Sequence, residues 1–216
     1  MMCNITEISR GLFLAPALFL SLLLQDAAFA EPPDLTMAKI RERQSMIRNA
    51  ARKFDVNPQY LSAIIHAERT LNYDWTDDTM DVAIAKAGRN SSLGFCQIKL
   101  KTAYFIEVQL HNAASRFYPG KRYQNILQVS LSPEDLIDKL MDDSSNVLYA
   151  AAYLRIMQTR WTKAGFPIDH RPDILGTLYS TGLFRAGGLE RQPNQRPKPN
   201  DFGRRVAETA RLFKEK

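Results

Sequence analysis

The stretch that decides the fold of this chain begins with NPQYLSAIIHAE at residues 57–68. Asn57 is a favoured helix N-cap, and Pro58 suits the first helical position, where its missing N–H costs nothing. The next apolar residues recur at the i, i+3, i+4 spacing of one helical face: Leu61, Ile64 and Ile65. The sequence therefore predicts a helix that starts after Asn57 and buries this face.

Glu68 falls on the same apolar face of the predicted helix, one turn after Ile64. Burial there disfavours the charged carboxylate and raises its pKa. A carboxyl that is still protonated near neutral pH is what a general acid requires. A glutamate at the end of a helix is more often simply solvated, so the assignment depends on the residues that follow.

The second half of the stretch reads SLGFCQIKLKTA at residues 92–103. It resembles the signature GAxGLMQIxPxTA of the lysozyme-like soluble lytic transglycosylases (the SLT family). In that family the signature follows a catalytic glutamate in a helix end of the form ESxFNP, which is similar to ERTLNY at residues 68–73. The resemblance implies that Glu68 is the catalytic acid. It also implies that Gln97 lines the substrate groove, where it hydrogen-bonds the sugar or Glu68.

Two later motifs of the same family follow in the family's order. NVLYAAAYL at residues 146–154 resembles NIxxGxxYL, and LYSTG at residues 178–182 resembles AYNAG. Tyr179 matches the family tyrosine, and the resemblance implies that its hydroxyl lies near the acid. Ser180 replaces the family asparagine, so this position lacks the side-chain amide of the family motif. The resemblance covers roughly residues 54–182.

The fold class implied by this resemblance is all-α: a lysozyme-like single domain with a groove between helices. Helical periodicity supports it at residues 34–54, 102–111, 145–164, 173–181 and 201–214, and no run favours a strand. Residues 31–216 are long enough for one domain with a sizeable core. The interval from Glu68 to the motif glycine, Gly94, is longer than in the family, which indicates an inserted acidic loop at residues 73–90.

The resemblance also implies a reaction, cleavage of the β-1,4 bond between MurNAc and GlcNAc in peptidoglycan. Glycosidases normally use two carboxyl groups. Two positions after Gln97, where some related lysozymes carry an aspartate, this chain has Lys99. The family alternative is a lytic transglycosylase, a lyase in which the substrate's N-acetyl group stabilises the cation and the sugar's own 6-hydroxyl attacks. Glu68 then acts as base, and the product is 1,6-anhydroMurNAc.

Further residues are expected to contact the glycan. Ser92 and Ser180 belong to the motifs that flank the expected groove, although both are also ordinary turn residues. Trp75 and Trp161 are suited either to stacking on sugar rings or to the core.

Two alternatives to the lyase stay open. One is a hydrolysing, lysozyme-type muramidase whose second carboxylate is an aspartate of the inserted loop: Asp74, Asp77, Asp78 or Asp81. The other is a catalytically inactive peptidoglycan-binding module that kept the groove. The intact Glu68 and Gln97 argue against the inactive module.

The amino-terminal segment, residues 1–30, has the pattern of a secretory signal peptide. Arg10 precedes an uncharged apolar run at residues 11–24, and Ala28 and Ala30 are the small residues that a signal peptidase requires. The apolar run is shorter than the roughly 20 residues that span a bilayer, although an uncleaved anchor is the alternative. The sequence thus predicts cleavage after Ala30 and an exported enzyme of the periplasm or cell envelope.

The net charge of +6 suits an anionic partner such as the cell wall. Lysines and arginines are scattered, without the dense runs of a nucleic-acid groove, so nucleic acid is not expected as a partner. We expect a monomer that binds peptidoglycan glycan strands, with secretion-system or wall-remodelling proteins as further candidate partners.

No cofactor or metal is expected. The three histidines are scattered without a His-x-x-x-His pair, and a helix would point His66 away from Glu68. Cys96 replaces the methionine of the family signature, and we interpret it as a small buried hydrophobic residue.

Overall fold

The computed structural model describes residues 31–71 and 92–213. The predicted signal peptide and the whole of the predicted acidic loop, with Trp75 and the four loop aspartates, lie outside these residues. The helices of the described part are α1 (Pro33–Glu42), α2 (Gln44–Phe54), α3 (Pro58–Leu71), α5 (Leu100–His111), α6 (Pro133–Met141), α7 (Asp143–Lys163), α8 (Pro172–Thr181) and α9 (Asp201–Thr209). Two 3₁₀ turns, η1 (Lys121–Tyr123) and η2 (Ala210–Phe213), complete the helical set.

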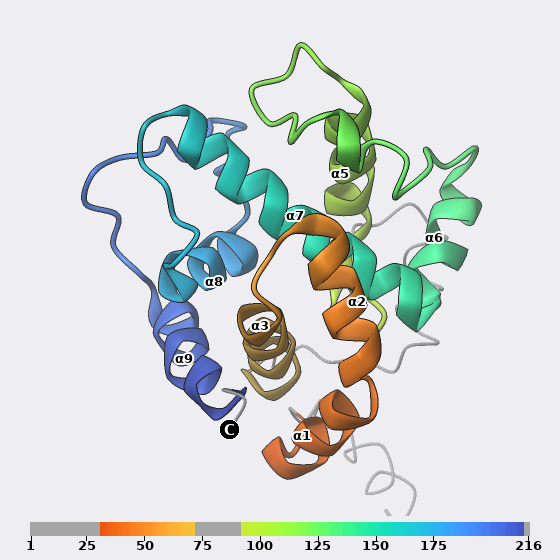
Figure 1. Ribbon diagram of the computed structural model, residues 1–216, viewed down its shortest axis with the longest axis vertical. Coiled ribbons are helices and arrows are strands. Elements are labelled where there is room, and N and C mark those ends of the chain that lie inside the picture. The colour runs from red at the N-terminus through yellow and green to blue at the C-terminus, as the bar shows by residue number, and fades with distance from the viewer. Residues whose placement is uncertain (1–30, 72–91, 214–216) are drawn as a thin grey trace, which may run out of the picture.

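Helix α3 lies near the centre of the molecule. Figure 1 shows α8 and α9 on one side of it and α1 and α2 on the other. Every residue from Leu61 to Ala67 is buried, so the helix is covered all round and not along one face alone. Asn57 starts the helix as predicted, because its side-chain oxygen accepts a hydrogen bond from the backbone N–H of Gln59 at 2.8 Å.

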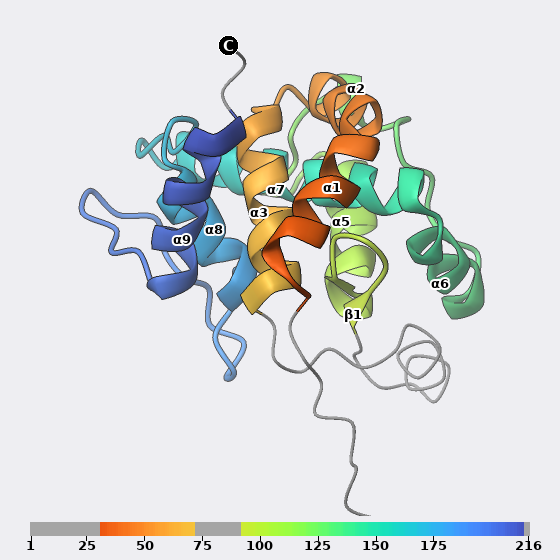
Figure 2. The same cartoon turned by 90° about the horizontal axis from the view of Figure 1, so that it is seen from below.

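The predicted helix at residues 34–54 is divided into α1 and α2 at Arg43, whose backbone leaves the helical conformation. The Arg43 Nε donates to Asp143 Oδ2 at 2.7 Å, which ties the break to the start of α7. The break lets α1 fold across α3, so the two parts cover different surfaces (Figure 2). Periodicity alone did not reveal this because both parts remain helical.

The predicted all-α single domain is confirmed as a mostly helical one, and it contains one small sheet that the sequence did not indicate. Strands β1 (Ser92–Leu93) and β2 (Ile98–Lys99) pair antiparallel, with Ser92 opposite Lys99. Two-residue strands are too short to show an alternating pattern in the sequence. Within the described residues, no helix has the length and apolarity needed to cross a membrane.

Candidate active site

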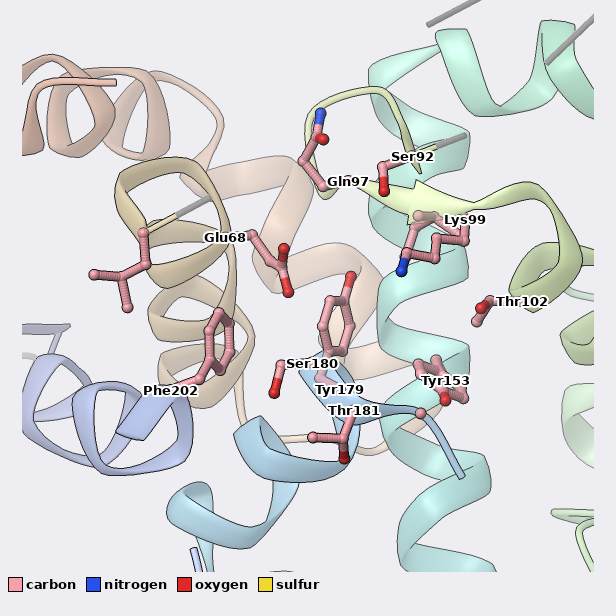
Figure 3. Close-up of a pocket in the computed structure, with 13 residues that line it drawn as sticks. Glu68, Ser92, Gln97, Lys99, Thr102, Tyr153, Tyr179, Ser180, Thr181 and Phe202 are labelled. Atoms are coloured by element: carbon pink, nitrogen blue, oxygen red, sulfur yellow. The ribbon is translucent and has the colours of Figure 1, made fainter. Parts of the chain in front are cut away.

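A cavity of about 350 Å³ opens between the end of α3, the β1–β2 hairpin, α8 and the start of α9 (Figure 3). Its wall contains all five residues predicted for the site: Glu68, Ser92, Gln97, Tyr179 and Ser180. They come from both halves of the described chain, so the fold brings together motifs that are far apart in sequence. Phe202 of α9 also lines the cavity, and no motif in the sequence indicated it.

Glu68 lies in the last turn of α3, and Figure 3 shows its carboxyl group pointing into the cavity. The side chain is partly buried among the surrounding helices. Burial raises its pKa from 4.5 to about 7, and the positive charge of Lys99 opposes that rise. A large fraction of Glu68 is therefore protonated at neutral pH, as a general acid must be.

The turn between β1 and β2 is held by Asn146 of α7. Its side-chain amide donates to the carbonyls of Leu93 at 2.9 Å and Leu140 at 2.8 Å, and it accepts from the N–H of Cys96 at 2.7 Å. Gly94 has a positive φ of 69°, and a Cβ there would come within 2.2 Å of the Leu140 oxygen. A glycine is therefore needed at position 94, because only a residue without a Cβ lets the turn approach Leu140 and Asn146 this closely. Asn146 in turn uses this close approach to make its hydrogen bonds to the turn.

Gln97 ends this turn with a positive φ of 53°, unusual for a residue other than glycine. Its side-chain Nε2 donates to the carbonyl of Gly94 at 3.1 Å, and Figure 3 shows the amide pointing away from Glu68. Gln97 lines the cavity and stabilises the turn at the same time. Its expected hydrogen bond to the substrate stays a prediction.

Tyr179 forms the opposite wall of the cavity. Its hydroxyl donates to the carbonyl of Cys96 at 2.9 Å, which links α8 to the turn of the hairpin. Burial raises the pKa of Tyr179 well above its usual value, and Cys96 and Glu68 nearby add to the rise. The hydroxyl thus stays protonated and acts as a hydrogen-bond donor.

The comparison with known proteins gives the family. No curated protein matches the sequence. A family model described as the catalytic domain of the T6SS peptidoglycan muramidase Tse3 matches residues 22–159, well over half of the chain. The chain belongs to this family.

Membership in the Tse3 catalytic-domain family makes the chain a peptidoglycan-cleaving enzyme, a muramidase. The predicted lysozyme-like fold and peptidoglycan substrate are thereby confirmed. The predicted SLT membership is replaced by the Tse3 family, whose description corresponds better to the muramidase alternative than to the predicted lyase. The matched range includes Glu68, Ser92 and Gln97 and ends before Tyr179 and Ser180.

Lys99 is the charged neighbour of the acid in this Tse3-family site. It follows the turn on β2, and Figure 3 shows its amino group directed towards Tyr179 and Glu68. Glu68 is the one carboxylate among the described residues that line the cavity. The loop aspartates that the sequence offered as second carboxylates lie outside the described residues.

The two predicted serines have different surroundings. Ser92 lies on β1, opposite Lys99. Ser180 donates to the carbonyl of Thr177 at 3.2 Å and accepts from the side-chain amide of Asn200 at 3.1 Å. Asn200 also caps α9, since its side-chain oxygen accepts from the N–H of Gly203. Sequence reasoning missed Asn200, although an asparagine before a helical pattern is a recognisable cap signal.

Three other residues that the sequence analysis considered do not line this cavity. Trp161 is buried in α7 and is not part of the cavity wall, so it belongs to the core. His66 faces a second cavity between α1, α3 and α9, on the other side of α3 from Glu68. Cys96 is fully buried and burial raises its pKa, which suits an inert apolar residue. The described residues contain no cluster of side chains suited to a metal ion.

Proposed function

We propose that this chain is a hydrolytic muramidase in which Glu68 protonates the glycosidic oxygen between MurNAc and GlcNAc. The observation that carries the proposal is a partly buried carboxyl, with a pKa of about 7, that points into the cavity. Such a group supplies a proton to the leaving sugar and is then an anion. Glu68 also belongs to a sequence motif that resembles the one carrying the catalytic acid in lysozyme-like enzymes.

The neighbours of Glu68 are suited to supporting this step. The positive charge of Lys99 favours the glutamate anion that forms once the proton has left. Tyr179 and the turn at Gly94 fix the wall opposite the acid. Gln97, Ser92 and Ser180 are the proposed substrate contacts, because each lines the cavity and carries a polar group.

Hydrolysis also needs a water molecule or a nucleophile on the opposite face of the sugar. Inverting enzymes hold that water with a second carboxylate roughly 6.5–9.5 Å from the acid, and retaining enzymes place a nucleophile at about 5–5.5 Å. We assign this role to one of the aspartates in the predicted loop at residues 73–90: Asp74, Asp77, Asp78 or Asp81. The family description as a muramidase supports hydrolysis over the lyase reaction.

The second candidate is the lytic transglycosylase reaction. It is favoured by the cavity itself, where Lys99 stands beside Glu68 and the described wall holds no other carboxylate. In that reaction the substrate's N-acetyl group stabilises the cation, and the 6-hydroxyl attacks in place of water. Glu68 then takes the proton of that hydroxyl, and the product is 1,6-anhydroMurNAc.

Mass spectrometry of the fragments released from purified peptidoglycan distinguishes the two reactions. Hydrolysis gives reducing MurNAc ends, whereas the lyase gives products lighter by the mass of one water. Asp→Asn variants at positions 74, 77, 78 and 81 are tested beside Glu68→Gln. The hydrolase predicts that one of the four is nearly as damaging as Glu68→Gln; anhydro products with four active variants establish the lyase. A folded wild type that releases nothing would contradict both reactions.

We also propose that the enzyme acts in the periplasm, where its substrate lies. Two features support export: the secretory pattern of residues 1–30 and the T6SS named in the family description. N-terminal sequencing of the exported protein should begin at Glu31. A start at Met1 in membrane fractions would contradict the signal-peptide prediction and leave the enzymatic proposal intact.

A further inference from the structure

Arg69, the residue directly after Glu68, is buried although it carries a charge. Its Nε and Nη2 donate to the two carboxylate oxygens of Glu31 at 2.7 and 3.1 Å, as a bidentate pair. Its Nη1 donates to the carbonyl of Phe95, in the hairpin turn, at 3.3 Å. One side chain therefore joins the beginning of the described chain, the end of α3 and the turn of the active site.

Glu31 is built into this junction by several bonds. Its carboxylate also accepts from the hydroxyl of Thr36 at 2.7 Å and from the ammonium of Lys39. Its backbone N–H donates to the carbonyl of Arg69 at 2.9 Å, so it also satisfies a carbonyl at the C-terminal end of α3. Figure 2 shows the start of the described chain beside the end of α3 and the hairpin.

Two guanidinium groups lie over the aromatic ring of Phe95. The Arg69 group lies 5.0 Å from the centre of its ring, and the Arg43 group lies 4.9 Å from it. Arg43 is fixed in turn by Asp143 at the start of α7. The turn is thus held in place both through the backbone carbonyl of Phe95 and through its aromatic ring.

From this geometry we infer that the Glu31–Arg69 pair positions the catalytic Glu68 relative to the hairpin turn. The inference rests on the proposed function, because it assigns a role to the residues that hold the proposed acid. Glu68 and Arg69 are consecutive in α3, so a shift of the Arg69 backbone moves Glu68. The facing wall depends on the turn, since Tyr179 donates to the carbonyl of Cys96, the residue after Phe95.

Stability alone is a weak reason for such a pair. Removing two charges from water is costly, and apolar residues of similar volume often stabilise a core as well or better. A planar guanidinium, however, fixes the direction of several hydrogen bonds at once, which an ammonium cannot do. The pair is therefore suited to setting the distance and angle between α3 and the turn.

The test measures kcat and KM separately on soluble, uncrosslinked glycan strands, with thermal unfolding of each variant. Arg69→Lys keeps the positive charge but loses the planar guanidinium that forms the bidentate pair. Glu31→Gln keeps the shape of the side chain but loses its negative charge. Each should lower kcat by about 10- to 100-fold, since small misplacements of a catalytic group have effects of this size. KM should stay within about twofold. Lys39→Gln is the matched control, because it removes another bond to the same carboxylate and leaves the Glu31–Arg69 pair in place, and its kcat should be close to wild type.

Wild-type kcat in folded Arg69→Lys and Glu31→Gln, with only lower melting temperatures, would overturn the inference. Equal losses in Lys39→Gln and Glu31→Gln would do so too, because they would indicate general destabilisation. If both main variants fail to fold, Glu31→Asp replaces them; a folded Glu31→Asp should have an intermediate kcat, and wild-type kcat would count against the pair. Glu68→Gln is measured in parallel: if it stays active, the proposed function fails, whereas an inactive Glu68→Gln beside normal pair variants refutes this inference alone.

Discussion

Replacing Glu68 by glutamine should make the protein more stable at pH 8 and leave its stability almost unchanged at pH 4.5. The pKa of Glu68 is raised from 4.5 to about 7 in the folded state, first by burial, with Lys99 opposing. The folded protein therefore holds a proton that the unfolded chain has released. Between pH 4.5 and pH 8, the contribution of Glu68 to the unfolding free energy of the wild type falls by up to about 3 kcal/mol. This figure follows from about 1.4 kcal/mol for each unit of pKa difference between the folded and unfolded states.

The direction of this effect follows from the raised pKa. The favourable contribution of protonated Glu68 is fully present below pH 4.5, and it is lost as the pH rises through about 7. Glutamine at position 68 keeps the shape of the side chain and does not titrate. The variant therefore does not lose this stability as the pH rises. The difference in unfolding free energy between the variant and the wild type should grow by up to about 3 kcal/mol between pH 4.5 and pH 8.

Urea denaturation followed by circular dichroism, at pH 4.5, 6, 7 and 8, measures this difference directly. Each titration gives an unfolding free energy for the wild type and for Glu68→Gln. A difference that is the same at every pH would refute the reasoning, because it would mean that Glu68 has an ordinary pKa in the folded state. The acid role assigned to it would then lose its physical basis.

Three further predictions concern the surroundings of Glu68. Lys99→Met removes the charge that lowers the pKa of Glu68, so the alkaline limb of the pH–kcat profile should move to higher pH; an unchanged limb would contradict this. Gly94→Ala forces a Cβ against the carbonyl of Leu140 and into a left-handed conformation, so it should lower the unfolding free energy by more than about 2 kcal/mol in urea titrations. Wild-type stability of that variant would show that the turn is not constrained as described. Tyr179→Phe leaves the Cys96 carbonyl without its donor and should cost about 1–3 kcal/mol of stability in the same titration, whereas a neutral result would mean that water replaces the hydroxyl.

Local signals explain the part of the fold that the sequence predicted. Asn57 was predicted as the N-cap of α3 because the signal lies within a few residues: its side-chain oxygen accepts from the backbone N–H of Gln59. The apolar spacing of the central helix is local in the same way. The motifs then indicated five of the residues that line the cavity, although the relative positions of these residues depend on the fold.

The rest depends on residues that are distant in sequence. Glu31 pairs with Arg69 across 38 positions, and Asn146 reaches the turn of the hairpin across 50 or more. No local pattern indicates such partners, because each side chain alone is an ordinary charged or polar residue. The place of Phe202 in the cavity wall could not be predicted either. It depends on the packing of α9 against α3 and α8, which the periodicity of α9 does not reveal.

The measurement that tests the central claim most directly is the rate at which Glu68→Gln releases fragments from purified peptidoglycan, compared with the wild type at pH 6 to 7. Circular dichroism and thermal unfolding first establish that the variant is folded. The loss of a general acid typically lowers a rate on the order of 10²–10⁴-fold, and we expect a loss of that size. A folded Glu68→Gln variant with near-normal turnover would contradict the account, because the proton that breaks the glycosidic bond would then have another source.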